Sequence, residues 1–315
     1  MTFISGTKTF FKSIITDIKE IRWYQTLFLC LFGILMVVFS TIDFNYLLGN
    51  RPYLLKWDND RDAGYVYWKR VLMTLSGAAS FTGAFCVVLV SLGKLSSYFW
   101  GILNTILYGT AAFAYGYVGD AQLNLFFFLP LQFIGIYNWL KHQNDSNKVS
   151  VKRLTLKTVI ISVLLIGGLY PFFWWEIPAF SKLLTGYYFY EGNKIAFWFD
   201  VTTNTLSVVA QYLLNNRHRE QWILWIIINC FQIAMFAGVG GFGVEFNVVC
   251  MWSFFLINSF YGFYQWYFVH ELEDKNKEID IELCDSNKVL SDSLNMETIY
   301  ENMEDNISCD SFKPE

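Results

Sequence analysis

The sequence DVTTNTLSVVAQYLLNN occupies residues 200–216 and carries regularly spaced polar residues within an otherwise apolar region. The residues at i, i+3, i+4, i+7 and i+11 are Asp200, Thr203, Asn204, Ser207 and Gln211. This spacing places all five on one face of an α-helix. Such a face must contact another helix or a water-filled cavity if the helix lies in a membrane, because lipid offers no hydrogen-bonding partners.

The composition indicates that lipid is the surrounding medium. Of the 315 residues, 54% are hydrophobic, 20% are aromatic and only 16% are charged, and the mean hydropathy is +0.33. A bilayer-spanning helix needs about 20 mostly apolar residues. We expect such helices at residues 27–48, 71–92, 97–117, 122–140, 157–179, 194–214, 221–239 and 245–269. The predicted fold is therefore an all-α integral membrane protein with eight transmembrane helices.

Two internal matches indicate a repeated three-helix unit. WGILNTILYG at 100–109 and WIIINCFQIA at 225–234 share Trp-x-x-x-Asn, and GIYNW at 135–139 matches GFYQW at 262–266. Both matches run in the same chain direction, so the two units, 71–140 and 194–269, are expected to be parallel repeats. The span 157–179 links them and restores the chain direction. The predicted arrangement is 3+1+3, with 27–48 as an additional N-terminal helix outside it.

Some features of single residues are also predicted within these spans. Pro130 lies inside the span 122–140 and is a candidate kink that would free a backbone carbonyl. Trp139 and Trp266 lie near predicted helix ends, which is typical of anchors at the membrane interface. Both assignments depend on position along the helix alone.

The distribution of charge predicts the orientation. The two ends and the loops of one side carry 14 Lys and Arg residues against 7 on the other side, so the positive-inside rule places both termini in the cytoplasm. We expect a multi-pass protein of the plasma membrane. Residues 1–26 form an amphipathic lead-in that is either a short interfacial helix or an unstructured segment. Residues 270–315 are acidic and rich in Ser and Asn, and we expect a disordered cytoplasmic tail.

Polar residues recur on the other predicted helices. Trp225, Asn229 and Gln232 stand at i, i+4 and i+7 of the helix that follows the opening stretch. The first unit contributes Asn104, Tyr108, Asn124, Gln132 and Asn138. One interpretation is that these side chains join helices, at about 0.6 kcal/mol for each hydrogen bond. The other is a shared substrate cavity, which the agreement of several helices favours. Asp200 could balance a cationic ring or cap its helix.

These residue types favour a neutral or weakly cationic ring compound that bears hydroxyl groups, because amides bind hydroxyls and carboxamides while indoles stack on rings. The sequence contains no GxSxG, P-loop or HExxH motif and no Cys/His cluster for a metal. A basic patch with interleaved aromatics is also missing. We therefore expect no enzymatic activity, no cofactor, no metal and no nucleic-acid partner.

Two longer stretches carry recognisable patterns. WFDVTTNTLSVVAQYLLNNRHREQWILWIIIN at 198–229 contains D-x-x-T-x-x-x-S-x-x-A-Q followed by E-x-W-x-x-W-x-x-x-N. YGYVGDAQLNLFFFLPLQFIGIYNW at 115–139 contains Gly, Leu-Asn, Gln and Gly-x-x-x-Trp. In these patterns the sequence resembles the PnuC family of nicotinamide riboside and vitamin transporters. The resemblance covers residues from about 70 to 269.

The resemblance implies a SWEET-like 3+1+3 fold, a homotrimer in membrane lipid, and uptake of nicotinamide riboside, an NAD precursor. Uptake would be facilitated diffusion by alternating access, coupled to trapping by a cytoplasmic kinase. The substrate pocket that the resemblance implies includes Gln132, Trp198, Asn204, Gln211, Trp225 and Asn229. The polar faces add Asn104, Asp200, Thr203 and Ser207 as candidates for substrate binding.

Other functions stay open. Carriers of thiamine, riboflavin or deoxynucleosides share the motifs quoted above. A membrane receptor or scaffold would act through the acidic tail, so deletion of residues 271–315 would abolish its function. A channel would conduct without saturation, and its sequence would show rings of one residue type, which we do not find.

Overall fold

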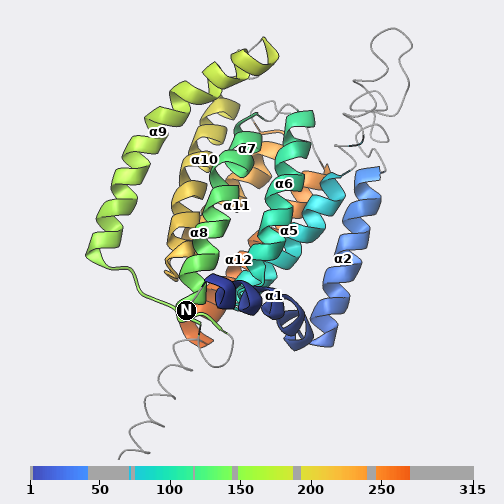
Figure 1. Ribbon diagram of the computed structural model, residues 1–315. Helices are drawn as coiled ribbons and strands as arrows, with labels where there is room; N and C mark the ends of the chain where they lie inside the picture. Colours follow the sequence, from blue (N-terminus) through green and yellow to red (C-terminus); the bar gives the residue numbers. More distant parts are fainter. Residues whose placement is uncertain are drawn as a thin grey trace, which may run out of the picture. The chain divides into compact units, whose positions relative to one another are not determined.

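The described part of the chain is built from helices. The computed structural model describes residues 3–41, 71, 75–115, 118–143, 148–186, 193–239 and 246–269 (Figure 1). The end of the predicted helix 27–48, the residues between it and the predicted helix 71–92, and the tail 270–315 lie outside the described residues.

A helix, or a run of joined helices, overlaps each of the eight predicted ranges, although α2 and α7 begin four residues earlier than predicted and α9 ends six residues later. The bounds are α1 Phe3–Glu20, α2 Trp23–Thr41, α5 Ser76–Ser91, α6 Ser97–Tyr115, α7 Val118–Gln122, α8 Leu129–Leu140, α9 Leu156–Thr185, α10 Lys194–Asn215, α11 Gln221–Phe236 and α12 Phe246–Tyr264. Two π-helical segments complete them, η1 Leu123–Phe128 between α7 and α8 and η2 Gln265–Val269 after α12. The lead-in, for which a helix and an unstructured segment were both open, forms α1 over residues 3–20.

Several helices are long and apolar enough to cross a bilayer. Within the described residues, the four that qualify by length and composition are Trp23–Ser40, Val118–Leu140, Leu156–Leu183 and Phe246–Val269. Ser76–Ser91 and Gln221–Phe236 are apolar but shorter. The polar face of α10 lowers its mean hydropathy, which explains why a helix of 22 residues does not qualify. The chain therefore has the features of a multi-pass membrane protein.

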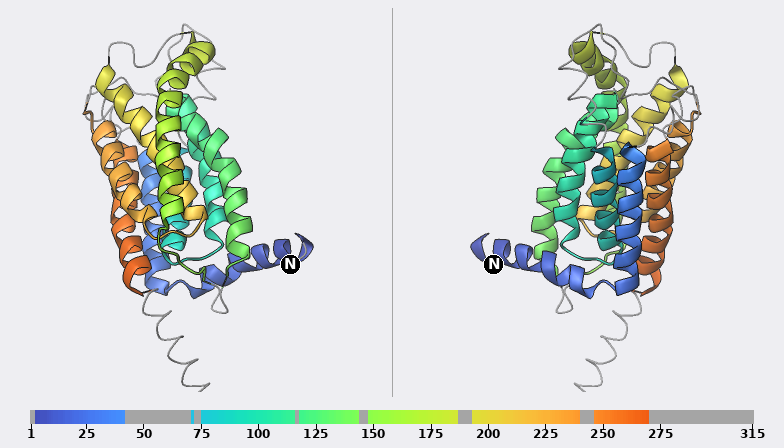
Figure 2. Two further views of the ribbon diagram at one scale, coloured as in Figure 1. Left: turned by 90° about the vertical axis from the view of Figure 1, so that its left-hand side faces the viewer. Right: turned by 90° about the vertical axis from the view of Figure 1, so that its right-hand side faces the viewer.

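The two units, α5 to α8 and α10 to η2, contact each other where α5 meets α12 and where α8 meets α10, and we call these units the two sets of helices. α5 lies against α2, α6 and α12, and α10 lies against α8, α9 and α11. The long helix α9 runs along one flank beside α10, and α2 stands on the opposite flank (Figure 1). α1 runs across the ends of the other helices rather than along them (Figure 2).

α1 is fixed to the turn between α5 and α6. The carboxylate of Asp17 is buried and accepts a hydrogen bond from the backbone N–H of Ser96 at 3.1 Å. The Lys94 ammonium forms an ion pair with Glu20. On the opposite face of α1, Phe11 and Ile15 are exposed. The helix thus presents one face to the protein and an apolar face to its surroundings, as an interfacial helix does.

A π-helical segment precedes the predicted kink at Pro130. The N–H of Leu129 donates to the carbonyl of Asn124, which is the five-residue spacing of a π-helix. Pro130 has no N–H to continue the α-helical ladder. The wider turn places Asn124 and Phe128 on the face of this helix that points into the protein.

The turns α5–α6 and α10–α11 have the same backbone geometry. Gly93 and Arg217 both adopt a left-handed conformation, with φ of 68° and 67°. The next residue in each turn, Lys94 or His218, donates its N–H to a carbonyl five residues earlier at 2.9 Å. Adding 124 to a residue number in the first turn gives the equivalent residue in the second turn, so Tyr98 corresponds to Trp222. The sequence match that pairs Trp100 with Trp225 uses a difference of 125 and is therefore displaced by one residue.

The Gly-x-Tyr-x-Trp motif holds the two sets of helices together. The indole N–H of Trp139, at the end of α8, donates to the carbonyl of Leu214 on α10 at 3.1 Å. The indole N–H of Trp266 donates to the carbonyls of Val90 and Ser91 on α5 at 3.2 and 3.1 Å. Both rings are fully buried, so the prediction that they are interface anchors is wrong. Each unit thus bonds to the first helix of the other.

The glycines of the same motif allow aromatic rings to approach. A Cβ atom at Gly135 would lie 2.2 Å from a ring carbon of Tyr98, and a Cβ atom at Gly262 would lie 2.4 Å from Trp222. Both rings are buried and have no room to retreat. In each copy of the motif, the Gly allows an aromatic ring to approach the helix, and the Trp one turn later donates a hydrogen bond.

The segment before α9 joins the two equivalent turns. The N–H of Val149 donates to the carbonyl of Gly93 at 3.0 Å, and the N–H of Lys152 donates to the carbonyl of Arg217 at 2.8 Å. The Lys152 carbonyl in turn accepts from the N–H of Arg219 at 3.1 Å. Residues 148–153 therefore link the ends of both units on the side where α1 lies.

His218 in the second turn should make stability depend on pH. Its Nδ1 lies 3.2 Å from the carbonyl of Arg153, and its Nε2 lies 3.4 Å from the hydroxyl of Thr158. These contacts suit a neutral imidazole that donates from Nδ1 and accepts at Nε2. Burial lowers the pKa of His218 below its ordinary value of 6.5.

We therefore expect thermal stability to fall on acidification. Above about pH 6.5 the imidazole is neutral in both the folded and the unfolded protein. Below that pH the unfolded chain takes up the proton first, so stability declines as the pH falls through the lowered pKa of the folded state. His218→Gln should flatten this part of the pH profile of the unfolding temperature, whereas His142→Gln, at an exposed position, should not. An unchanged slope in His218→Gln would contradict the assignment.

Candidate substrate cavity

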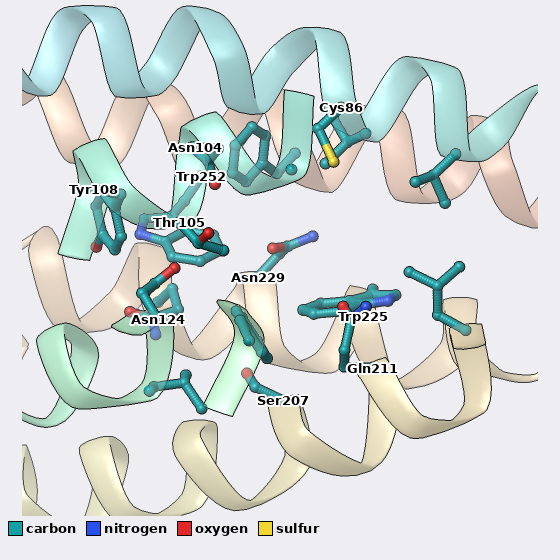
Figure 3. Close-up of a pocket in the computed structure, with 18 of the residues that line it drawn as sticks. Cys86, Asn104, Thr105, Tyr108, Asn124, Ser207, Gln211, Trp225, Asn229 and Trp252 are labelled. Atoms are coloured by element: carbon teal, nitrogen blue, oxygen red, sulfur yellow. The ribbon is translucent and has the colours of Figure 1, made fainter. Parts of the chain in front are cut away.

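A cavity lies between the two sets of helices, lined by residues of α5, α6, α10, α11, α12 and the α7–η1–α8 run (Figure 3). Its lining alternates amide and hydroxyl side chains with aromatic rings. Figure 3 shows Tyr108, Asn124 and Trp252 grouped toward one end and Trp225 and Gln211 toward the other, with Asn229 and Ser207 between them. We call these the Tyr108 end and the Trp225 end.

Six of the ten predicted site residues line this cavity. They are Asn104, Gln132, Ser207, Gln211, Trp225 and Asn229. The first two come from the first unit and the other four from the second, so both units contribute. Contact with a ligand stays a prediction for each of them.

The polar face of α10 divides into two parts. All five of its predicted residues are buried, but only Ser207 and Gln211 line the cavity. Nearer the start of the helix, the Asn204 amide donates to the carboxylate of Asp200 at 2.9 Å and to its carbonyl at 2.8 Å. The Asp200 carboxylate packs against Gly119, where an added Cβ would lie 2.1 Å from it. This part of the polar face, which includes Thr203, lies where α10 contacts α7.

Trp198 lies away from the cavity. Its side chain is 42% exposed, and its ring contacts Phe231 with the centroids 5.7 Å apart. The cavity lining does not include Trp198, Asp200, Thr203 or Asn204. A role for these four in substrate binding stays a prediction that the arrangement of the cavity does not favour.

The main residue that the sequence did not single out is Asp120. Its side chain lines the cavity and is only 2% exposed. Its carboxylate accepts a hydrogen bond from the Tyr108 hydroxyl at 3.0 Å and one from the Gln232 amide at 3.5 Å, the long limit for such a bond. Asp120 falls between two predicted spans, but α7 already begins at Val118. Thr105, Trp252 and Ser259 also line the cavity without having been predicted.

Four buried polar atoms in the lining have no hydrogen-bonding partner in the described structure. They are Oδ1 of Asn229, Oε1 of Gln232, and Nε1 of Trp222 and of Trp252. The amide nitrogen of Asn229 is satisfied by the Ser259 hydroxyl at 2.9 Å, which fixes the direction of its free oxygen. Buried polar atoms without partners are costly unless a ligand or water satisfies them. Two acceptors and two donors are thus available to a bound molecule.

The charges of the cavity limit what it can hold. Among the described residues that line it, Asp120 is the one acidic side chain and none is Lys, Arg or His. No cluster of metal-binding side chains occurs in the described ranges. Such a lining suits a ring compound that is neutral or positively charged, and it offers no cation to a phosphate group.

One end of the cavity meets a buried aromatic cluster. Val90, Leu214 and Trp222 line the cavity and also belong to this cluster. The cluster includes Tyr98, Trp139 and Trp266 and receives Phe10 of α1. The hydrogen bonds of Trp139 and Trp266 described above therefore lie directly beside the cavity, on the side of the two turns.

A multi-pass helical protein with a polar and aromatic cavity between two related sets of helices has the features of a small-molecule transporter. Residues 73–268 match the family described as nicotinamide mononucleotide transporter. This match covers well over half of the chain, which therefore belongs to that family, one of transporters rather than enzymes.

Individual relatives agree with this assignment, and the resemblance to PnuC is confirmed. The nicotinamide riboside transporter PnuC of Neisseria mucosa is 31% identical over 201 residues, or 61% of this chain and 71% of the relative. The PnuC of Haemophilus influenzae is 33% identical over 197 residues, or 61% of this chain and 78% of the relative. A crystal structure described as the vitamin B3 transporter PnuC shares the fold, with a TM-score of 0.52 and 24% identity over 76% of this chain and 90% of that one.

Proposed function

We propose that the protein takes up nicotinamide riboside. The observation that carries this proposal is the lining of the cavity, whose described residues place carboxamides and aromatic rings around one carboxylate and include no basic side chain. A ribose offers hydroxyls to the carboxamides, and a pyridinium ring stacks on indole or phenol faces. The family description names the mononucleotide, whose phosphate would face Asp120 without a neutralising cation. The riboside fits this chemistry better, and it is the compound in the names of the PnuC relatives.

The transmembrane arrangement belongs to the same proposal. We infer eight spans, formed by α2, α5, α6, the α7–η1–α8 run, α9, α10, α11 and the α12–η2 run, in a SWEET-like 3+1+3 order with α2 outside it. The shared geometry of the two turns and the reciprocal bonds of Trp139 and Trp266 support two parallel repeats. A homotrimer in the plasma membrane is part of the proposal through the family resemblance.

The orientation follows from the basic residues of the turns. Lys94, Lys152 and Arg217 lie on the side where α1 crosses the helix ends. The positive-inside rule supports a cytoplasmic location for that side and for both termini. The aromatic cluster at that end of the cavity would then be the barrier toward the cytoplasm.

The mechanism we propose is facilitated diffusion by alternating access. The two repeats would move against each other so that the barrier formed by the aromatic cluster opens while the opposite side closes. The chain has no P-loop for ATP hydrolysis. Net uptake would therefore depend on a cytoplasmic kinase that phosphorylates the riboside and prevents its return.

Uptake into proteoliposomes tests this proposal. We expect saturable entry of labelled nicotinamide riboside that stops when the inside and outside concentrations are equal. Enclosing an ATP-dependent riboside kinase with ATP should raise the accumulated label well above that level. Thiamine, riboflavin, a deoxynucleoside and nicotinamide mononucleotide serve as competitors. If one of them competes more strongly than unlabelled nicotinamide riboside, that compound is the substrate, and the proposed mechanism still holds.

The same assay separates the other classes of function. Entry that rises linearly with concentration would indicate a channel. A chain lacking residues 271–315 should transport at the full rate, because the family match ends at residue 268. Loss of transport in that chain with unchanged stability would favour a receptor or scaffold that acts through the tail.

A further inference from the structure

The Tyr108 end of the cavity combines three features, of which the carboxylate occurs nowhere else in the described lining. Aromatic rings meet there, since Tyr108 packs edge-on against Trp252 with the ring centroids 6.4 Å apart, and Trp252 packs edge-on against Phe255 at 5.4 Å. Asp120 stands directly behind the hydroxyl of Tyr108. Gln232 and Trp252 each hold a buried polar atom that has no partner among the described residues.

Within the described residues, the carboxylate of Asp120 lies close to the cavity and is paired with no basic side chain. Its described hydrogen-bond donors, Tyr108 and Gln232, are both uncharged. The described lining contains no basic residue. A charge in such a poorly solvated site acts over several ångströms on a ligand in the cavity, since little water is present to screen it. The same charge strengthens the attraction of the adjacent ring faces for a cation.

The unpartnered atoms at this end complement a primary carboxamide. Gln232 Oε1 can accept a hydrogen bond, and Trp252 Nε1 can donate one. A carboxamide offers an NH2 group to the first and an oxygen to the second. The amides of Gln132 and Gln211 line the cavity as well, and Gln211 lies toward the Trp225 end (Figure 3).

We propose that Asp120 makes the cavity selective for the positive charge of its ligand, and that a cationic ring bearing a carboxamide binds at the Tyr108 end, with the sugar toward the Trp225 end. This inference rests on the proposed function and assigns the polarity of the ligand within the cavity. Asp120 acts through its charge rather than by a bidentate contact with sugar hydroxyls, because its side chain is almost completely buried.

A pair of ligands that differ in charge tests the proposal. Nicotinamide riboside carries a pyridinium ring, and benzamide riboside has the same shape and carboxamide with a neutral phenyl ring. Calorimetry on the purified full chain gives the Kd of each ligand, and the measured quantity is the ratio of the two Kd values. For the unmodified protein we expect a preference of about tenfold or more for the cation.

Three variants make the test specific. Asp120→Asn keeps the shape and removes the charge, so its preference for the cation should fall at least about fivefold, mainly through weaker binding of nicotinamide riboside. Tyr108→Phe keeps the carboxylate and removes one of its donors, and the preference should persist. Glu176→Gln is the matched control, because Glu176 lies on α9 outside the lining and accepts from Gln122 at 2.6 Å. Its ratio should equal that of the unmodified protein.

Each result has one meaning. An unchanged ratio in Asp120→Asn, or equal weakening of both ligands, would overturn the selectivity and leave Asp120 with a packing role. If Asp120→Asn does not fold, Asp120→Glu replaces it, and the proposal then requires the preference for the cation to survive. If the unmodified protein binds neither ligand, the proposed function itself fails. Binding of both without any preference overturns this inference and retains the function.

Discussion

Trp225→Ala is expected to weaken the binding of nicotinamide riboside by about 30- to 100-fold, whereas Trp198→Ala should change it less than about threefold. Trp225 lines the cavity, and its ring lies against Phe128 with the centroids 6.3 Å apart. Its indole N–H is held by Gln221 at 3.3 Å, which fixes the orientation of the ring. Removing the side chain takes away a stacking surface and leaves an empty volume beside the ligand.

Trp198 provides the matched control because both residues are Trp and both are part of the pocket that the family resemblance implies. Calorimetry on the two purified variants measures the difference directly. Equal and large losses would show that the substrate contacts α10 near residue 198, outside the described cavity. Loss in Trp198→Ala alone would place the site elsewhere altogether.

Trp139→Ala and Trp266→Ala are each expected to destabilise the folded protein by about 3–5 kcal/mol. Both rings are fully buried, and each also donates a hydrogen bond across the two sets of helices. Trp139→Phe retains most of the packing and loses the donor, so about 1–3 kcal/mol should be lost through the missing hydrogen bond and the volume that the smaller ring leaves. The unfolding temperature in nanodiscs, followed by intrinsic fluorescence, reports these differences.

The control for this pair is Trp175→Ala, because Trp175 is 70% exposed on α9. Its unfolding temperature should change little. The two buried positions should give similar losses if the repeats are equivalent in energy as well as in geometry. A large loss at Trp139 with none at Trp266 would show that the second unit depends less on this contact.

The positions of the helices could be predicted because hydrophobic length is a local property of the sequence. The difference that matters for the site is the start of α7, where Gly119 and Asp120 lower the local hydropathy and place the start of the predicted span at residue 122. The charge of Asp120 made it resemble a loop residue. Its burial depends on Tyr108 and Gln232, which come from two other helices, so no local pattern could have revealed it.

The candidate site could be predicted in part, because the spacing of polar residues along one helix is also a local property of the sequence. The polar face of α10 was identified by its periodicity, and all of its residues are indeed buried. Periodicity does not tell which part of a face meets a cavity and which part meets another helix. On α10, the part near Asp200 contacts a helix because Gly119 allows α7 to approach it. Gly119 and Asp200 are 81 positions apart in the sequence, so a local pattern does not reveal their contact. In the same way, proximity to a helix end could not show that Trp139 is buried by the second unit.

The reciprocal bonds of Trp139 and Trp266 also affect how the protein can be made in a cell. Trp139 lies in the first unit, but its partner Leu214 is translated 75 residues later. Trp266 completes the other contact near the end of the family match. A ribosome would therefore deliver the first three-helix unit to the membrane before the residues that finish its packing exist. Assembly of both units must wait until nearly all spans have been inserted, so a chain truncated before residue 214 should be a target for membrane quality control.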